Sequence, residues 1–198
     1  YLLGEANLES ERLPEKLKFK GHLTRAIDGT SFFTPRTRDL LAHFSPRNTT
    51  AEEGETHYPY GLMVSAINVY TGQPVRAVVD DYRTSERKCL KKLVAHFQPG
   101  DLSLLDRGLG GQLVYLDYVR NGQYFVHRAI TSGDRVAHFI QSFLKSEKKQ
   151  QQVQINVIEP DTRETLTLSL RLLRGPVDSE GKTIVFVTNL LNKKCYRR

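Results

Sequence analysis

Runs of apolar residues, either alternating with polar ones or continuous, dominate the pattern of the chain and predict a protein built on a β-sheet. Thr71 and Gly72 separate two of these runs, which is typical of a β-hairpin. Gly, Pro, Asn or polar clusters bound the runs and mark where strands end. The expected strands cover residues 22–33, 61–70, 74–80, 101–106, 124–129, 153–158, 165–173 and 183–191.

Apolar residues spaced three and four apart predict helices between several of these strands. Ser85 is a suitable N-cap for the first helix, and Pro99 with Gly100 ends it. Further helices are predicted over residues 111–122 and 137–145. The apolar stripe of the first helix consists of Cys89, Leu90, Leu93, Val94 and Phe97.

The order of these elements, β-ββ-α-β-α-β followed by further strands, predicts an α/β fold with a mixed sheet. We expect a helical linker over residues 1–21 and the main α/β domain over 22–131. Residues 132–180 are expected to form a mostly β insertion, and 181–198 a strand that returns to the main sheet with the C-terminal end. A polar, loop-forming composition fills much of residues 35–55.

Composition narrows the class of protein. The 198 residues suffice for one domain with an insertion, and no apolar run approaches the roughly 20 residues of a membrane span. The net charge of +7 favours a polyanionic partner. Cys89 and Cys195 are far apart and have no second Cys or His at zinc-finger spacing, so a reducing cytosol is the simplest compartment.

Two acidic residues follow apolar strands and precede a glycine. Asp28 lies in an Asp-Gly-Thr sequence and Asp106 in Asp-Arg-Gly. If their strands are neighbours, the carboxylates converge, and carboxylates that close usually share a divalent cation such as Mg²⁺. Two such ions can activate water for phosphodiester displacement. The alternative for each residue alone is an aspartate that caps a turn.

These segments resemble a known family. DRGLGGQLVYLDYVRNGQYFVHR, residues 106–128, is similar to the second-aspartate segment of the IS4 family of insertion-sequence transposases, relatives of the Tn5 transposase. AIDGTSF resembles the first-aspartate strand of that family, and SERKCLKKLVAHFQPGDLSLLDRG the helix and strand before the second aspartate. TIVFVTNLL resembles the strand that ends its β insertion, so the resemblance extends over about residues 25–191.

The resemblance implies a ribonuclease-H-like catalytic domain of the DDE type, in which two Asp and one Glu hold Mg²⁺ or Mn²⁺. Asp28 and Asp106 would be the catalytic, metal-binding aspartates. The third carboxylate of the family belongs to a Tyr-x-x-Arg-x-x-x-Glu pattern downstream of the last strand, and the sequence stops at Arg198 without it. We therefore expect a chain truncated before the third acidic residue, with metal and DNA affinity but impaired chemistry.

Three further residues are candidates for DNA binding. Arg128 resembles the family arginine near the DNA end, with a surface salt bridge as the alternative. Arg107 is expected to orient a phosphate or to point away from the site, and Thr30 to hydrogen-bond near the first metal or to act as a turn residue. We interpret His127 as a half-exposed strand residue, because no second histidine lies at a metal-ligand spacing.

The predicted function is that of a DDE transposase fragment, whose intact form nicks DNA at insertion-sequence ends and transfers the strand. Its expected partners are the transposon ends and target DNA, with no membrane, at the bacterial nucleoid in the cytoplasm. Dimerisation of the intact protein stays open. The alternatives are a ribonuclease-H-like nuclease or resolvase, which would cleave without strand transfer, and an inactive DNA-binding transposase remnant.

Overall fold

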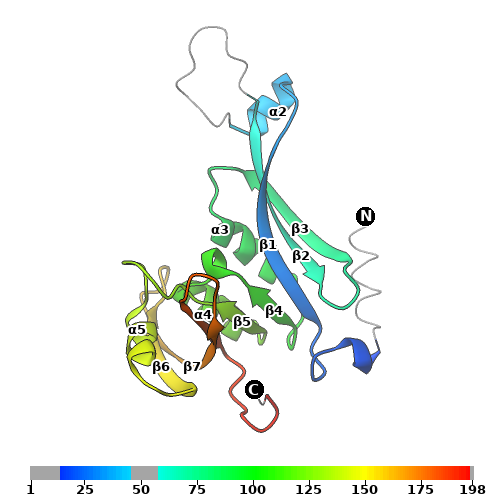
Figure 1. Ribbon diagram of the computed structural model, residues 1–198. Coiled ribbons are helices and arrows are strands. Elements are labelled where there is room, and N and C mark those ends of the chain that lie inside the picture. The colour runs from blue at the N-terminus through cyan, green and yellow to red at the C-terminus, as the bar shows by residue number, and fades with distance from the viewer. Residues whose placement is uncertain (1–13, 46–57, 197–198) are drawn as a thin grey trace.

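A mixed sheet of eight strands runs through the protein in the order β3-β2-β1-β4-β5-β8-β7-β6. The computed structural model describes residues 14–45 and 58–196 (Figure 1). The predicted α/β class and the predicted order of elements are confirmed. The strands are β1 Thr24–Phe33, β2 Tyr60–Asn68, β3 Pro74–Asp81, β4 Leu102–Leu105, β5 Tyr124–Arg128, β6 Gln150–Ile158, β7 Thr165–Val177 and β8 Thr183–Thr188.

The direction of the strands changes across the sheet. β1, β2 and β3 form an antiparallel meander, whereas β4 and β5 add to β1 in parallel. β8 pairs antiparallel with both β5 and β7, and β6 pairs with β7 at the far edge. The strands of the predicted insertion therefore extend the same sheet. The four-part division of the chain stays a prediction.

Helices lie between the strands as their spacing predicts. Ser85 caps the first long helix, because its hydroxyl accepts a hydrogen bond from the amide of Lys88 at 3.3 Å. Arg174 of β7 donates to the carbonyls of Phe143 and Ser146 and so caps the end of the last helix. The helices are η1 Glu15–Leu17, α2 Arg38–His43, α3 Glu86–Val94, η2 Arg107–Leu109, α4 Gln112–Arg120 and α5 His138–Lys145, where η denotes a 3₁₀ helix.

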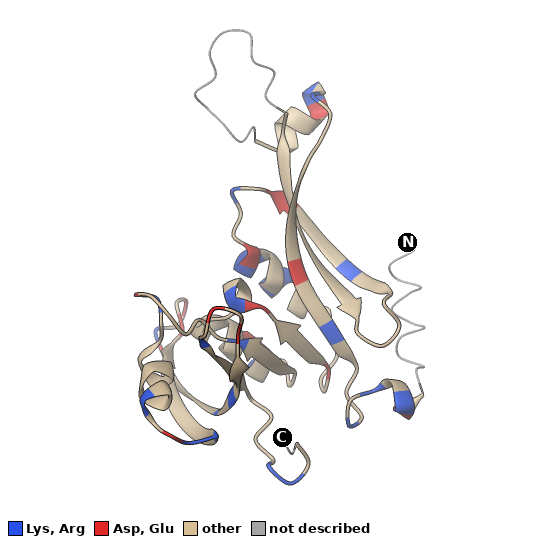
Figure 2. Ribbon diagram, in the orientation of Figure 1, with Lys and Arg blue, Asp and Glu red and all other residues tan. Residues whose placement is uncertain are grey.

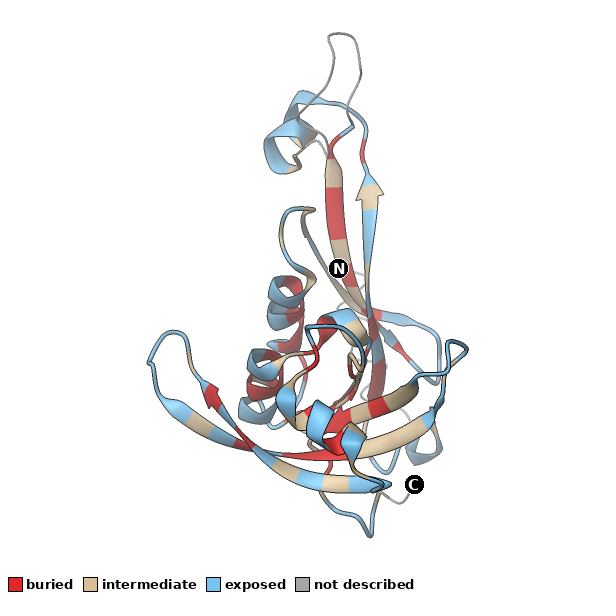
Figure 3. Cartoon of the chain, turned by 60° about the vertical axis from the view of Figure 1, so that its left-hand side comes forward, coloured by how far each residue is buried: buried red, intermediate tan, exposed pale blue. Residues whose placement is uncertain are grey.

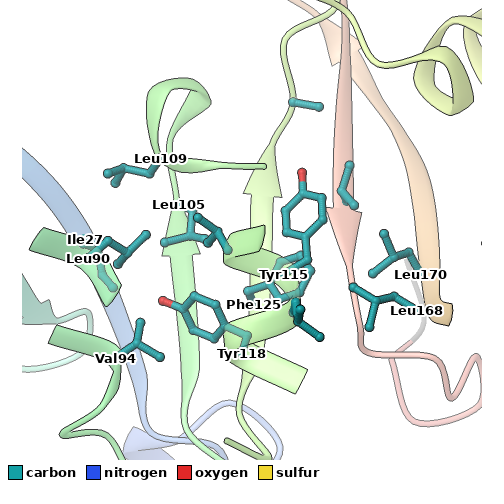
Figure 4. Close-up of a cluster of buried hydrophobic side chains, with 14 of the residues drawn as sticks. Ile27, Leu90, Val94, Leu105, Leu109, Tyr115, Tyr118, Phe125, Leu168 and Leu170 are labelled. Carbon is teal, nitrogen blue, oxygen red and sulfur yellow. The ribbon is translucent and has the colours of Figure 1, made fainter. Parts of the chain in front are cut away.

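The core lies between the sheet and the pair of helices α3 and α4, where buried positions concentrate (Figure 3). The ring of Tyr115 stacks on that of Phe125 at 4.7 Å between centroids, and Tyr118 packs against the same ring. In Figure 4, Leu168 and Leu170 of β7 lie to the right of these aromatic residues, and they belong to the same cluster. One continuous core thus joins the two halves of the sheet.

A buried ion pair fastens the beginning of β1 to the segment before β4. The side chain of Arg25 is 2% exposed and pairs with the carboxylate of Asp101. Its guanidinium also lies 4.6 Å from the ring centroid of Phe97. Separating Arg25 from Asp101 would leave a buried charge without its partner, which is costly. The ion pair therefore helps to keep β1 and β4 in register.

The structure describes only part of two segments that the sequence analysis considered, the linker and the long loop. The predicted helical linker is described only from residue 14, where η1 and a bridge between Phe19 and His22 occur. Residues 46–57 of the predicted loop lie outside the described residues.

β1 and β2 extend beyond the rest of the sheet toward α2 (Figure 1). Within the described ranges, no helix is long and apolar enough to cross a membrane.

Candidate active site

The pairing of β1 with β4 brings the two predicted aspartates together. Ile27 lies opposite Leu105 in the parallel register, and the residue that follows each of them in the chain is an aspartate. Both Asp28 and Asp106 are exposed. Because Ile27 faces the buried core, Asp28 lies on the opposite face of β1. The neighbouring strands that the sequence analysis required are thus present.

The two carboxylates have few internal hydrogen bonds. Within residues 14–45 and 58–196, Asp28 Oδ1 accepts a single hydrogen bond, from the amide of the following Gly29 at 2.9 Å. Asp106 begins η2, and its side chain makes no hydrogen bond that caps this turn. Thr30 is exposed on the same face of β1 as Asp28, two residues further along. Oxygen atoms of both aspartates are therefore available to an external ligand.

The carboxylate of Glu86, which the sequence analysis missed, lies near the backbone just after Asp28 and just after Asp106. A Cβ atom at Gly29 would lie 2.6 Å from Glu86 Oε1, and one at Gly108 would lie 3.5 Å from Glu86 Oε2. Glu86 is the first residue of α3. Its position directly after the Ser85 cap is the sequence signal that locates it, since acidic residues favour the first turn of a helix.

Behind η2, a buried hydrogen-bonded chain supports the segment that follows Asp106. The hydroxyl of Tyr115 lies 2.7 Å from His127 Nδ1, and His127 Nε2 lies 3.4 Å from the carbonyl oxygen of Arg107. A carbonyl only accepts, so Nε2–H donates to it and Nδ1 accepts from the tyrosine. A Cβ atom at Gly110 would come within 2.0 Å of the His127 ring, so only glycine permits this approach.

The exposure predicted for His127 is wrong. The residue is 3% exposed, because Gly110 and Tyr115 cover the ring. Burial lowers its pKa from 6.5 to about 4, mainly by removing water from the charged form, and outweighs the opposing effect of the Arg107 carbonyl. His127 is therefore neutral at physiological pH. Burial likewise raises the pKa of Tyr115.

The two arginines predicted to contact DNA meet one internal carboxylate. Arg107 Nη2 lies 3.1 Å from Asp178 Oδ2, and Arg128 Nη2 lies 3.7 Å from the same oxygen. Asp178 belongs to the turn between β7 and β8, and the backbone amides of Lys182 and Glu180 also bind it and, with Arg107, hold its pKa below the usual value. In this structure Arg128 therefore makes a salt bridge, which the sequence analysis gave as the alternative to DNA binding.

Charge around the site is mixed rather than uniformly basic (Figure 2). Acidic and basic residues occur together on β1, at the start of α3 and around the β7–β8 turn. Among the residues that the structure describes, no group of three or more His, Cys, Asp or Glu side chains comes together. The described chain thus offers an aspartate pair, with Glu86 approaching the adjacent backbone.

Comparison with known proteins identifies the family. Residues 19–191 match the family model of the transposase DDE domain. The chain belongs to this family. The match covers every strand of the sheet, including β6 and β7, so those strands are part of the DDE domain. No curated protein sequence matches the chain.

One solved structure supports the fold. The piggyBac transposase in its synaptic complex with hairpin DNA is 9% identical, with a TM-score of 0.50 over 86% of this chain and 34% of that one. This chain therefore spans about a third of the length of that transposase, and the likeness supports the ribonuclease-H-like fold. Endonuclease V of Ciona intestinalis, in complex with inosine-containing DNA, is 12% identical over 94% of this chain and 81% of its own, with a TM-score of 0.29.

Proposed function

We propose that this DDE domain carries out metal-dependent cleavage and joining of DNA strands at the ends of an insertion sequence. The observation that carries the proposal is the parallel pairing of Ile27 with Leu105, which sets Asp28 beside Asp106 on adjacent strands. Membership of the transposase DDE family supports this choice of reaction for the aspartate pair. The two aspartates are proposed as the catalytic residues.

Divalent cations fit the donors at this position. Mg²⁺ and Mn²⁺ prefer carboxylate oxygens as ligands. Those of Asp28 and Asp106 are exposed, and no side chain in the described part of the chain donates a hydrogen bond to them. Asp28 and Asp106 would hold the cation, which supplies an activated water and stabilises the leaving oxygen in phosphodiester displacement. The remaining ligands are proposed to come from water, from the DNA and from the third carboxylate of the IS4 pattern.

DNA is the proposed partner. The net charge of +7 favours binding to phosphates, and the fold resembles a transposase solved with hairpin DNA. Arg107, Arg128 and Thr30 are proposed to contact the strand that reaches the aspartates. For the two arginines this requires exchange of the Asp178 carboxylate for a DNA phosphate. Assembly as a dimer and a place at the bacterial nucleoid belong to the same proposal.

A nicking assay tests the proposed function. Supercoiled plasmid is incubated with the purified chain and Mg²⁺ or Mn²⁺, and nicked circles are quantified. We expect slow nicking that EDTA stops and that Asp28→Asn or Asp106→Asn reduces at least about 100-fold. Asp134→Asn, at an exposed position between β5 and α5, serves as the control. Equal nicking by all four proteins would show that the aspartate pair has no catalytic role.

A further inference from the structure

A cavity of about 400 Å³ opens beside the segment that follows Asp106. Its walls come from the start of α3, η2, the start of α4, β5, the segment between β5 and α5, and the start of α5. Arg107 and Gly108 form the side nearest the aspartate pair, and Tyr115, Phe139 and Ile140 form the apolar side. The volume is ample for a phosphate group with part of the sugar attached to it.

Two arginines at this cavity have no counter-ion in the described part of the chain. Arg87 and Arg135 are exposed, and within the described ranges neither side chain pairs with a carboxylate. Arg87 Nε donates to the carbonyl oxygen of Gly108 at 3.1 Å, which extends the guanidinium across the loop before α4. Arg87 Nη1 would lie 3.6 Å from a Cβ at Gly111, so the terminal nitrogens reach the cavity edge.

The remaining polar groups of the cavity suit an anion. His127 is neutral and fully engaged by Tyr115 and the Arg107 carbonyl, so it contributes no competing charge. None of the described residues that line the cavity is Asp or Glu. Guanidinium groups bind phosphate in a bidentate fashion, and apolar walls strengthen such charge-assisted hydrogen bonds by excluding water.

We propose that this cavity binds a phosphate group, held by Arg87 and Arg135. The source of that phosphate, an inference that rests on the proposed function, is the DNA strand engaged at Asp28 and Asp106. Arg107 differs from these two arginines because Asp178 already neutralises it. The cavity would therefore fix the strand while the aspartates act on it.

The test uses two probes, inorganic phosphate and a DNA duplex. The variant Arg87→Gln/Arg135→Gln is compared with wild type and with Arg76→Gln/Arg163→Gln, which removes the same charge from β3 and from the β6–β7 turn. Melting temperature is measured against phosphate at constant ionic strength. Phosphate is expected to raise it for the wild type and the control and not for the cavity variant. Equal melting temperatures without phosphate confirm that all three proteins fold.

DNA affinity is then measured by fluorescence anisotropy across a range of salt concentrations. The cavity variant is expected to bind about tenfold more weakly than the control, with a salt slope reduced by about 0.9 for one lost phosphate contact. Identical phosphate responses in the cavity and control variants would overturn the inference. A wild-type protein that responds to phosphate but binds no duplex would retain the cavity site and overturn the proposed function.

Discussion

Ile27 of β1 lies opposite Leu105 of β4, and both side chains are buried in the same core. Because parallel strands advance together, this pairing carries the following residues, Asp28 and Asp106, to the same end of the sheet. A shift of one residue would turn a carboxylate into the core and an apolar side chain into solvent. Packing of the core therefore sets the position of the aspartate pair.

Removing the charge of Asp178 should strengthen DNA binding. Asp178→Asn keeps the oxygen that accepts hydrogen bonds from the amides of Glu180 and Lys182, so the turn is preserved. Arg107 and Arg128 lose their shared counter-ion and become available to phosphates. We expect an increase of about threefold in duplex affinity at moderate salt, measured by anisotropy.

Glu180→Gln is the matched control for this prediction. It removes one negative charge from the same turn, where Glu180 pairs with Lys182 and not with either arginine. The general change in net charge is thus identical. If both variants bound the duplex equally well, the two ion pairs of Asp178 would have no specific influence on DNA binding.

Gly110→Ala should destabilise the segment behind the site. The new methyl group would lie within 2.0 Å of the His127 ring, which Tyr115 holds in place. We expect a loss of about 1–3 kcal/mol in the free energy of unfolding, measured by urea denaturation. Gly108→Ala provides the comparison, because its methyl group would meet Glu86 at 3.5 Å, an ordinary contact distance. Equal stability of the two variants would contradict the close approach at Gly110.

Burial of His127 predicts a specific dependence of stability on pH. Its pKa is about 4 in the folded protein and 6.5 when unperturbed, so between these values the unfolded chain binds a proton that the folded chain excludes. Stability contributed by neutral His127 is therefore complete above pH 6.5 and is lost as the pH falls toward 4. The shift corresponds to about 3 kcal/mol as an upper bound.

Comparison of His127→Gln with the wild type isolates this contribution from that of other titrating groups. The free energy of unfolding is measured by denaturation from pH 4 to 7, and the wild type should lose more stability on acidification than the variant does. His96→Gln, which replaces an exposed histidine after α3, should behave like the wild type. Parallel pH profiles for all three proteins would mean that folding does not shift the pKa of His127.

Local signals were sufficient to predict the elements of the sheet. Alternation and turn residues identified β1 and the β2–β3 hairpin, and Ser85 predicted the start of α3. Boundaries were less accurate: β7, for example, continues to Val177, beyond the apolar run that ended at residue 173. There the strand persists because pairing with β8 extends past a register irregularity.

Contacts between distant segments could not be predicted from local pattern. Asp178 lies 71 residues from Arg107, and no periodicity relates the two. The burial of His127 likewise depends on Gly110, whose missing side chain allows the ring to approach. A strand histidine next to an arginine has the same pattern whether exposed or buried, so only the packing of α4 on β5 distinguishes the cases.

Binding of Mn²⁺ to the aspartate pair tests the central claim most directly. The electron paramagnetic resonance signal of free Mn²⁺ is recorded while the wild-type chain or the variant Asp28→Asn/Asp106→Asn is added. The account predicts that the wild type depletes the free signal at millimolar concentrations and that the double variant does not. Equal depletion by the two proteins would show that Asp28 and Asp106 do not form a metal site.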